Sequence, residues 1–203
     1  MFKLFKKWFS KPTMLEVTPT IKKTRDDLIK EVNLSIFKQP DITNVDKNIT
    51  ILILDDIPES ITLYNSDFLR IGKRYNKNIL EDLKIVYTIG RPAGYIAYKY
   101  IIEHPNTINY AILDITLGYI IKLEDGEYIE LDGIDIAIYL LRYNTNIKFL
   151  FSTAHTLNRR NPTMEYYFNK FESETGLNIE DYYLNKNSDR AEKIYNMIYG
   201  DTL

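Results

Sequence analysis

The chain has 203 residues, 45% of them hydrophobic, and a formal net charge of −2. This length allows one good-sized domain with an extension, or two very small domains. The small net charge gives no global field that would recruit nucleic acid. The chain has no cysteine, which excludes disulfides, thiolate metal sites and a cysteine nucleophile, and which fits the cytoplasm.

Residues 1–47 are expected to form an extension ahead of a domain at residues 48–203. Residues 1–11 (MFKLFKKWFSK) interleave aromatic and lysine side chains, so a helix there would suit an anionic membrane surface, although a frayed terminus is the plainer interpretation. Thr18 and Pro19 predict the start of a helix that ends before Pro40. This helix either packs on the domain or forms a homodimer through one apolar stripe, made of Leu28, Ile29, Val32 and Ile36. Residues 39–48 are interpreted as a linker.

From residue 49 the chain alternates short apolar strands with helices. We expect strands at residues 49–54, 83–88, 110–113, 148–152 and 182–185. Each strand is followed by a helix, at residues 60–75, 91–103, 134–143, 162–175 and 188–199. Ser188 is the expected N-cap of the last helix, and Gly176 ends the fourth. The alternation predicts an α/β fold with a doubly wound parallel sheet covered on both faces.

One segment departs from this alternation. Residues 119–131 (YIIKLEDGEYIEL) stand between the third strand and its helix, with Asp125-Gly126 between two alternating runs. An Asp-Gly pair in this position is a hairpin signal. We expect a β-hairpin inserted at the ligand-binding edge of the sheet, as a lid or as a docking surface.

Carboxylates follow two of the expected strands where these end. Asp55 and Asp56 end the first strand (ILILDD), and Asp114 ends the third (YAILD). The carboxyl ends of neighbouring parallel strands meet at one edge of a sheet, so these groups would crowd together. They must then share protons or bind a cation. Oxygen ligands with room for water favour Mg²⁺ over zinc.

The remaining strand ends supply a hydroxyl and an ammonium group. Beside a metal, Asp114 would keep one oxygen free as a nucleophile toward phosphorus. The fourth strand ends in Ser152-Thr153, and Lys186 follows the fifth. Metal, nucleophile, hydroxyl and ammonium are the parts that phosphoryl transfer needs. Taken singly, each group is more simply a turn cap, a strand-end hydroxyl or a solvated lysine, but their coincidence at one edge favours a site.

The chain from about residue 49 to its end resembles the receiver domain of bacterial response regulators. The resemblance rests on five short motifs in the family's order: ILILDD, YAILD, Asp132-Gly133 ahead of IDIAIYLLR, the STA of residues 152–154, and YYLNK. It implies a flavodoxin-like fold with strand order 2-1-3-4-5. It also implies that Asp114 accepts a phosphoryl group from a histidine of a sensor kinase or phosphotransfer protein. The implied metal ligands are Asp55, Asp56 and Asp114 for Mg²⁺, with Thr153 and Lys186 assisting and Tyr183 as the aromatic switch residue.

We therefore expect a stand-alone response regulator that signals to a downstream protein target, because no output domain follows the last helix. No enzymatic activity is expected beyond phosphorylation and dephosphorylation of its own aspartate. Asn187 replaces the family's usual proline, and the segments between the site residues are long. These departures leave open a degenerate receiver that docks partners without phosphorylation. A haloacid-dehalogenase-like phosphatase ranks lower, because Thr116 stands where that family has a second acid.

Overall fold

The centre of the protein is a mostly parallel six-stranded sheet. The structure is a computed structural model, and it describes residues 23–154, 161–186 and 190–200. The strand order is β1-β3-β2-β4-β7-β8, formed by β1 (Asp41–Ile42), β2 (Thr50–Asp55), β3 (Lys84–Ile89), β4 (Ile108–Asp114), β7 (Lys148–Thr153) and β8 (Tyr183–Asn185). Strands β3, β2, β4, β7 and β8 run parallel. This is the flavodoxin-like 2-1-3-4-5 order, so the predicted fold class is confirmed.

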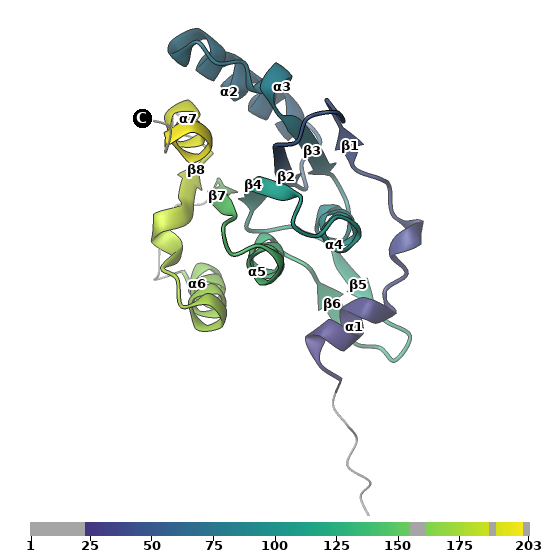
Figure 1. The fold of residues 1–203 in the computed structure, drawn as a ribbon. Helices are drawn as coiled ribbons and strands as arrows, with labels where there is room; N and C mark the ends of the chain where they lie inside the picture. Colours follow the sequence, from purple (N-terminus) through teal and green to yellow (C-terminus); the bar gives the residue numbers. More distant parts are fainter. Residues whose placement is uncertain (1–22, 155–160, 187–189, 201–203) are drawn as a thin grey trace, which may run out of the picture.

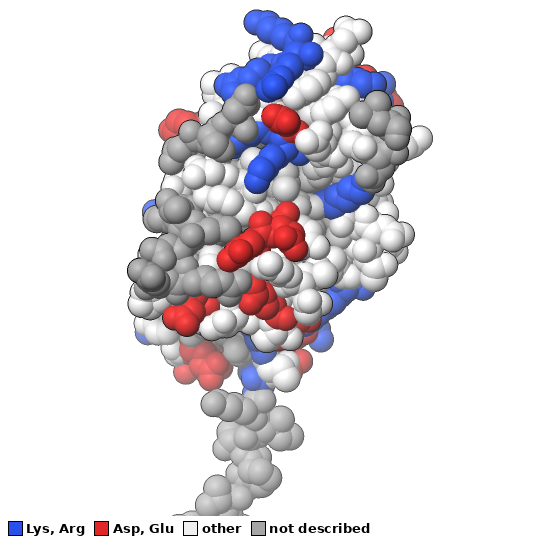
Figure 2. Space-filling model, turned by 90° about the vertical axis from the view of Figure 1, so that its left-hand side faces the viewer, with Lys and Arg blue, Asp and Glu red and all other residues white. Residues whose placement is uncertain are grey.

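Helices cover both faces of the sheet (Figure 1). One face carries α2 (Ser60–Tyr75), the short α3 (Ile79–Asp82) and α7 (Ala191–Tyr199). The other face carries α4 (Ala93–Glu103), α5 (Gly133–Tyr143) and α6 (Pro162–Thr175). Figure 2 shows the side that bears α7, β8 and α6, on which basic side chains gather at the height of α2 and acidic ones lie across the middle and lower part. Within the described residues, no helix combines the length and the apolar composition that a membrane crossing requires.

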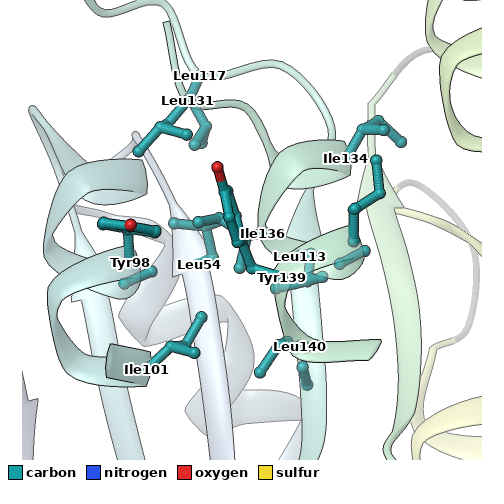
Figure 3. Packing of buried hydrophobic residues seen from close by; sticks show 14 of the residues in the cluster. Leu54, Tyr98, Ile101, Leu113, Leu117, Leu131, Ile134, Ile136, Tyr139 and Leu140 are labelled. Atoms are coloured by element: carbon teal, nitrogen blue, oxygen red, sulfur yellow. The ribbon is translucent and has the colours of Figure 1, made fainter. Parts of the chain in front are cut away.

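The larger core lies between the sheet and helices α4 to α6. Leu54 of β2 and Leu113 of β4 are paired neighbours and pack against Ile136 and Leu140 of α5 (Figure 3). Side chains alternate between the two faces of a strand. The residues that follow Leu54 and Leu113 are Asp55 and Asp114, and the alternation therefore turns both carboxylates towards the α2 side.

The inserted hairpin is present as predicted. Strands β5 (Ile120–Lys122) and β6 (Tyr128–Glu130) pair antiparallel, and Gly126 at the turn has a φ of +88°. The hydroxyl of Tyr95 on α4 donates to the carbonyl of Ile129 at 2.8 Å. Strand β6 also contacts helix α1 (Arg25–Glu31) of the extension. The hairpin is thereby bonded to α4 on one side and in contact with the N-terminal extension on the other.

The N-terminal extension differs from its prediction. Its helix, α1 (Arg25–Glu31), begins after a capping box formed by Thr24 and Asp27. A separate 3-10 turn, η1 (Leu34–Ile36), is capped by Asn33, so one helix running from Thr18 towards Pro40 is wrong. The predicted helix start, with Thr18 as cap and Pro19 at the first helical position, lies outside the described residues, as do residues 1–11. The linker prediction is also incomplete, because β1 adds a strand to the β3 edge.

Helix α1 packs on the domain rather than standing apart. Leu28, Ile29 and Val32 are buried in the core shared with α4 and α5. Arg25 lies 2.5 Å from the carboxylate of Asp135 on α5 and also donates to the carbonyl of Glu130. Of the two roles predicted for this helix, the structure shows the packing one.

The last helix starts later than predicted. Helix α7 begins at Ala191, and its N-cap is Arg190 rather than Ser188. The Arg190 side chain makes no capping bond, because a guanidinium has no acceptor for the helix N–H groups. It is directed to Asp67 of α2 instead.

Candidate functional site

Three carboxylates meet at the carboxyl edge of the sheet. Strands β2 and β4 are neighbours in register, with Leu54 beside Leu113, so Asp55 and Asp114 end next to each other. One oxygen from each of Asp55, Asp56 and Asp114 lies within 4.8 Å of the others. Asp55 is fully buried and Asp114 is 5% exposed, whereas Asp56 is half-buried. The structure therefore brings together the three carboxylates that the strand ends predict.

Lys186 bridges two of the three carboxylates. Its Nζ lies 2.7 Å from Asp55 Oδ2 and 2.6 Å from Asp114 Oδ2. Strand β8 brings it there, because the Lys186 N–H donates to the Thr153 carbonyl at 3.0 Å and so extends the pairing of β7 with β8. Both ion pairs are almost fully removed from solvent. The lysine is part of the site and not the solvated loop residue of the plainer interpretation.

The site is short of positive charge. Burial raises the pKa of the Asp114 carboxyl to about 6, with a further rise from Asp55 and Asp56 that Lys186 opposes. Burial lowers the pKa of the Lys186 ammonium, but Asp114 and Asp55 outweigh it, so the pKa is raised overall. Three carboxylates and one ammonium leave a formal charge of −2 when all are ionised. An added cation is the direct way to compensate that charge.

A magnesium ion fits these residues. The donor set is oxygen only, as Mg²⁺ prefers, and Asp56 at the solvent side leaves space for the water ligands that Mg²⁺ keeps. Asp55, Asp56 and Asp114 would hold the ion. When bound, it would neutralise charge on the carboxylates and on a phosphoryl group.

Asp55 has further partners that fix its orientation. Its Oδ1 accepts the N–H of Ile57 at 3.0 Å, which is the turn-capping bond that the plainer interpretation proposes. Its Oδ2 accepts the hydroxyl of Tyr64 at 3.2 Å. Burial raises the pKa of the Tyr64 phenol well above its ordinary value, and Asp55 adds to this rise. Tyr64 was not predicted as a site residue.

The other predicted residues lie around this centre. Thr153 is fully buried at the end of β7, and its neighbour Ser152 pairs in register with Asp114. Tyr183 is half-buried at the start of β8, where its carbonyl accepts Lys193 Nζ at 2.7 Å. Asp56 Oδ2 faces the Gly118 N–H, at 3.4 Å, in the loop after β4. Asn187, which replaces the family's usual proline, lies outside the described residues.

The Asp132-Gly133 pair lies at the start of α5, within a second cluster of charged groups. Asp132 caps α5 in a box with Asp135, and Lys170 of α6 lies 2.8 Å from Asp132 and 2.9 Å from Asp135. Burial and the charge of Asp135 raise the pKa of Asp132 to about 7, against the effect of Lys170. Arg25 also pairs with Asp135. This cluster joins the extension, α5 and α6.

Comparison with known proteins gives matches among solved structures only. No protein-family model matches the chain, and no curated protein matches its sequence. A chain of the CheX-CheY-BeF3-Mg²⁺ complex from Borrelia burgdorferi is 14% identical, over 76% of this chain and 90% of that chain, with a TM-score of 0.45. A LuxR-family DNA-binding response regulator from Staphylococcus aureus is 20% identical, over 75% and 97%, with a TM-score of 0.45. A response regulator receiver domain protein from Clostridium thermocellum is 18% identical, over 76% and 97%, with a TM-score of 0.43.

Proposed function

We propose that this chain is a receiver of phosphorelay signalling and that Asp114 is its phosphoacceptor. The observation that carries the proposal is the Lys186 ammonium, which bridges Asp55 and Asp114 inside a group of three carboxylates. A structural ion pair needs one carboxylate, and a third carboxylate beside it costs stability unless a cation binds. This arrangement suits a site that takes up Mg²⁺ and then a phosphoryl group.

The proposed reaction moves one phosphoryl group. An Asp114 carboxylate oxygen attacks the phosphorus of a phosphohistidine on a sensor kinase or phosphotransfer protein. The P–O bond forms as the P–N bond breaks, and the imidazole nitrogen leaves with the bond's electron pair and takes up a proton. The Lys186 ammonium would move its contact from the carboxylates to a negatively charged phosphoryl oxygen. The Thr153 hydroxyl would donate to another phosphoryl oxygen.

The output would be a change of protein contacts. Helix α6, strand β8 and helix α7 form a face that includes Tyr183, and phosphorylation would draw Thr153 towards Asp114 and let Tyr183 turn inward. Hydrolysis of its own aspartyl phosphate is the only other chemistry proposed. The expectation of a stand-alone regulator in the cytoplasm stays a prediction.

The proposal is tested by thermal melting with Mg²⁺ and then with Mg²⁺ plus beryllofluoride, which mimics an aspartyl phosphate. A ligand that binds only the native state raises the melting temperature by mass action. We expect each addition to raise it, and we expect Asp114→Asn to abolish the beryllofluoride step. Asp46→Asn is the matched control, since Asp46 is an exposed carboxylate before β2. No shift with either addition would favour the non-phosphorylated docking module instead.

A further inference from the structure

Tyr64 and Asp67 place polar groups in the middle of the buried face of helix α2. This face packs on the sheet through Phe68 and Ile71, yet it also includes Tyr64 and Asp67, and both are buried. Asp67 pairs with Arg190, the residue before α7, which is 1% exposed and donates to the Asp67 carboxylate, and the half-exposed Arg70 lies 4.0 Å from its other oxygen. A buried ion pair is expensive to desolvate, so packing alone gives no reason for it.

Tyr64 joins this ion pair to the carboxylate site. The guanidinium carbon of Arg190 lies 5.1 Å from the centre of the Tyr64 ring, within the range of a cation–π contact. The Tyr64 hydroxyl donates to Asp55 Oδ2 at 3.2 Å. That oxygen also accepts Lys186 Nζ at 2.7 Å. A continuous set of contacts thus runs from Asp67 through Arg190 and Tyr64 to Asp55.

We propose that Tyr64, held by the Arg190–Asp67 pair, is a positioning residue for the Asp55–Lys186 pair and so sets the cation affinity of the site. The hydroxyl shares Asp55 Oδ2 with Lys186, which keeps the carboxylate in one orientation and weakens the hold of the ammonium on it. Without the hydroxyl, Asp55 loses one of the bonds that orient it, and Lys186 is the one partner of that oxygen left among the described residues. Both effects oppose release of Asp55 to an incoming cation. This inference rests on the proposed function, because it deepens the account of the same site.

The test is the Mg²⁺ affinity of the full chain, measured by calorimetric titration with MgCl₂, beside the melting temperature of the metal-free protein. We expect Tyr64→Phe to weaken Mg²⁺ binding about tenfold, as is typical when a partner of a metal ligand is lost. Tyr87→Phe is the matched control: it also removes a buried phenol hydroxyl that bonds to α2, at Asn65, but away from the carboxylates. Tyr64→Phe affinity equal to or tighter than that of the wild type would overturn the proposal.

A second variant separates positioning from folding. Arg190→Met alone removes the buried partner of the Asp67 carboxylate, which can unfold the protein. Asp67→Leu with Arg190→Met removes both charges and is expected to fold, because apolar residues of similar size commonly replace a buried ion pair. We expect this double variant to lose Mg²⁺ affinity as Tyr64→Phe does. A merely structural ion pair would change the melting temperature and leave the Mg²⁺ affinity unchanged, and that result also contradicts the proposal.

A metal-free measurement keeps the inference distinct from the proposed function. If the wild type binds no Mg²⁺, the proposed function fails. The positioning role is then decided by a double-mutant cycle of Tyr64→Phe and Lys186→Met on the denaturant midpoint. Residues that share one oxygen are expected to be non-additive. Additive shifts in the midpoint would overturn the positioning role.

Discussion

Gly133 stands directly against the backbone of Asp114: a Cβ atom at position 133 would lie 1.9 Å from the Asp114 carbonyl oxygen. The Gly133 N–H also donates to the carbonyl of Ile115 at 3.2 Å. The first residue of α5 is therefore packed on the chain that carries the proposed phosphoacceptor. A side chain at position 133 therefore requires the backbone at Asp114 to shift. A flexible side chain could avoid such a contact by changing its rotamer, but backbone atoms cannot.

The first prediction concerns Gly133→Ala. Alanine in a helix is ordinarily more favourable than glycine by about 1 kcal/mol. Here the clash with Asp114 reverses the sign, and we expect a loss of about 1–3 kcal/mol in the free energy of unfolding, together with weaker Mg²⁺ binding. Gly200→Ala is the control, because a Cβ there meets nothing closer than Asn196 Cβ at 3.7 Å. Urea unfolding of the two variants checks this; equal midpoints would show that the β4–α5 contact yields without cost.

The second prediction concerns pH and Asp114. Its pKa is about 6 in the folded protein and 3.8 as the ordinary value, so the native state holds this proton more tightly than the unfolded chain does. Stability of the metal-free protein should therefore fall as pH rises from about 4 to 6, and the loss from this group stays constant above that range. The shift of about two units corresponds to at most about 3 kcal/mol.

Asp114→Asn isolates this contribution. We expect the loss of stability between pH 4.5 and pH 7 to be smaller in Asp114→Asn than in the wild type, measured by urea unfolding in a chelator. Asp132, whose pKa is raised to about 7, also makes stability fall as pH rises. This loss of stability occurs in both proteins and therefore cancels in the comparison. A variant with the slope of the wild type would mean that Asp114 titrates near its ordinary pKa.

Much of this fold follows from local signals in the sequence. The predicted helices at residues 60–75 and 162–175 coincide with α2 and α6, because periodic apolar residues and end signals such as Gly176 act over one or two turns. The acids of the site were predictable because strand ends converge in a parallel sheet. Strand β1 was missed because its two residues are exposed and gain their structure only by pairing with β3.

The Tyr64–Arg190–Asp67 group could not be predicted in the same way. Arg190 and Asp67 are 123 residues apart, and no local pattern links them. One signal did exist, since Asp67 falls on the apolar face of a helix that otherwise buries Phe68 and Ile71. A charge at such a position requires a buried partner. The sequence alone offers many candidate arginines and lysines for that role.

The third prediction tests the docking of the N-terminal helix. Ile29 of α1 is 0% exposed, whereas Ile36 in the following 3-10 turn is 71% exposed. We expect Ile29→Ala to cost about 2–5 kcal/mol and Ile36→Ala less than about 0.5 kcal/mol in the free energy of unfolding. Similar small effects for both variants would mean that α1 does not stay packed on the domain in solution.

The fourth prediction concerns Tyr183, the proposed switch residue. Tyr183 is half-buried on β8, beside Lys193, whose Nζ lies 6.0 Å from the centre of the ring. A half-buried aromatic ring has room for a second orientation, which a buried core ring lacks. We expect Tyr183→Ala to keep the melting shift produced by Mg²⁺ and beryllofluoride, because the ring is not part of their proposed binding site.

The change at the output face should nevertheless be lost in Tyr183→Ala. In the wild type, beryllofluoride is expected to alter amide hydrogen exchange across α6, β8 and α7, and in the variant the change should stay within the loops around Asp114. Tyr143→Ala serves as control, since Tyr143 is an exposed tyrosine at the end of α5. If exchange at α6 still responds in Tyr183→Ala as in the wild type, the ring does not transmit the signal. Asp114 would then act on the α6 side by another route, for which the Lys170 contact with the α5 cap is the nearest candidate.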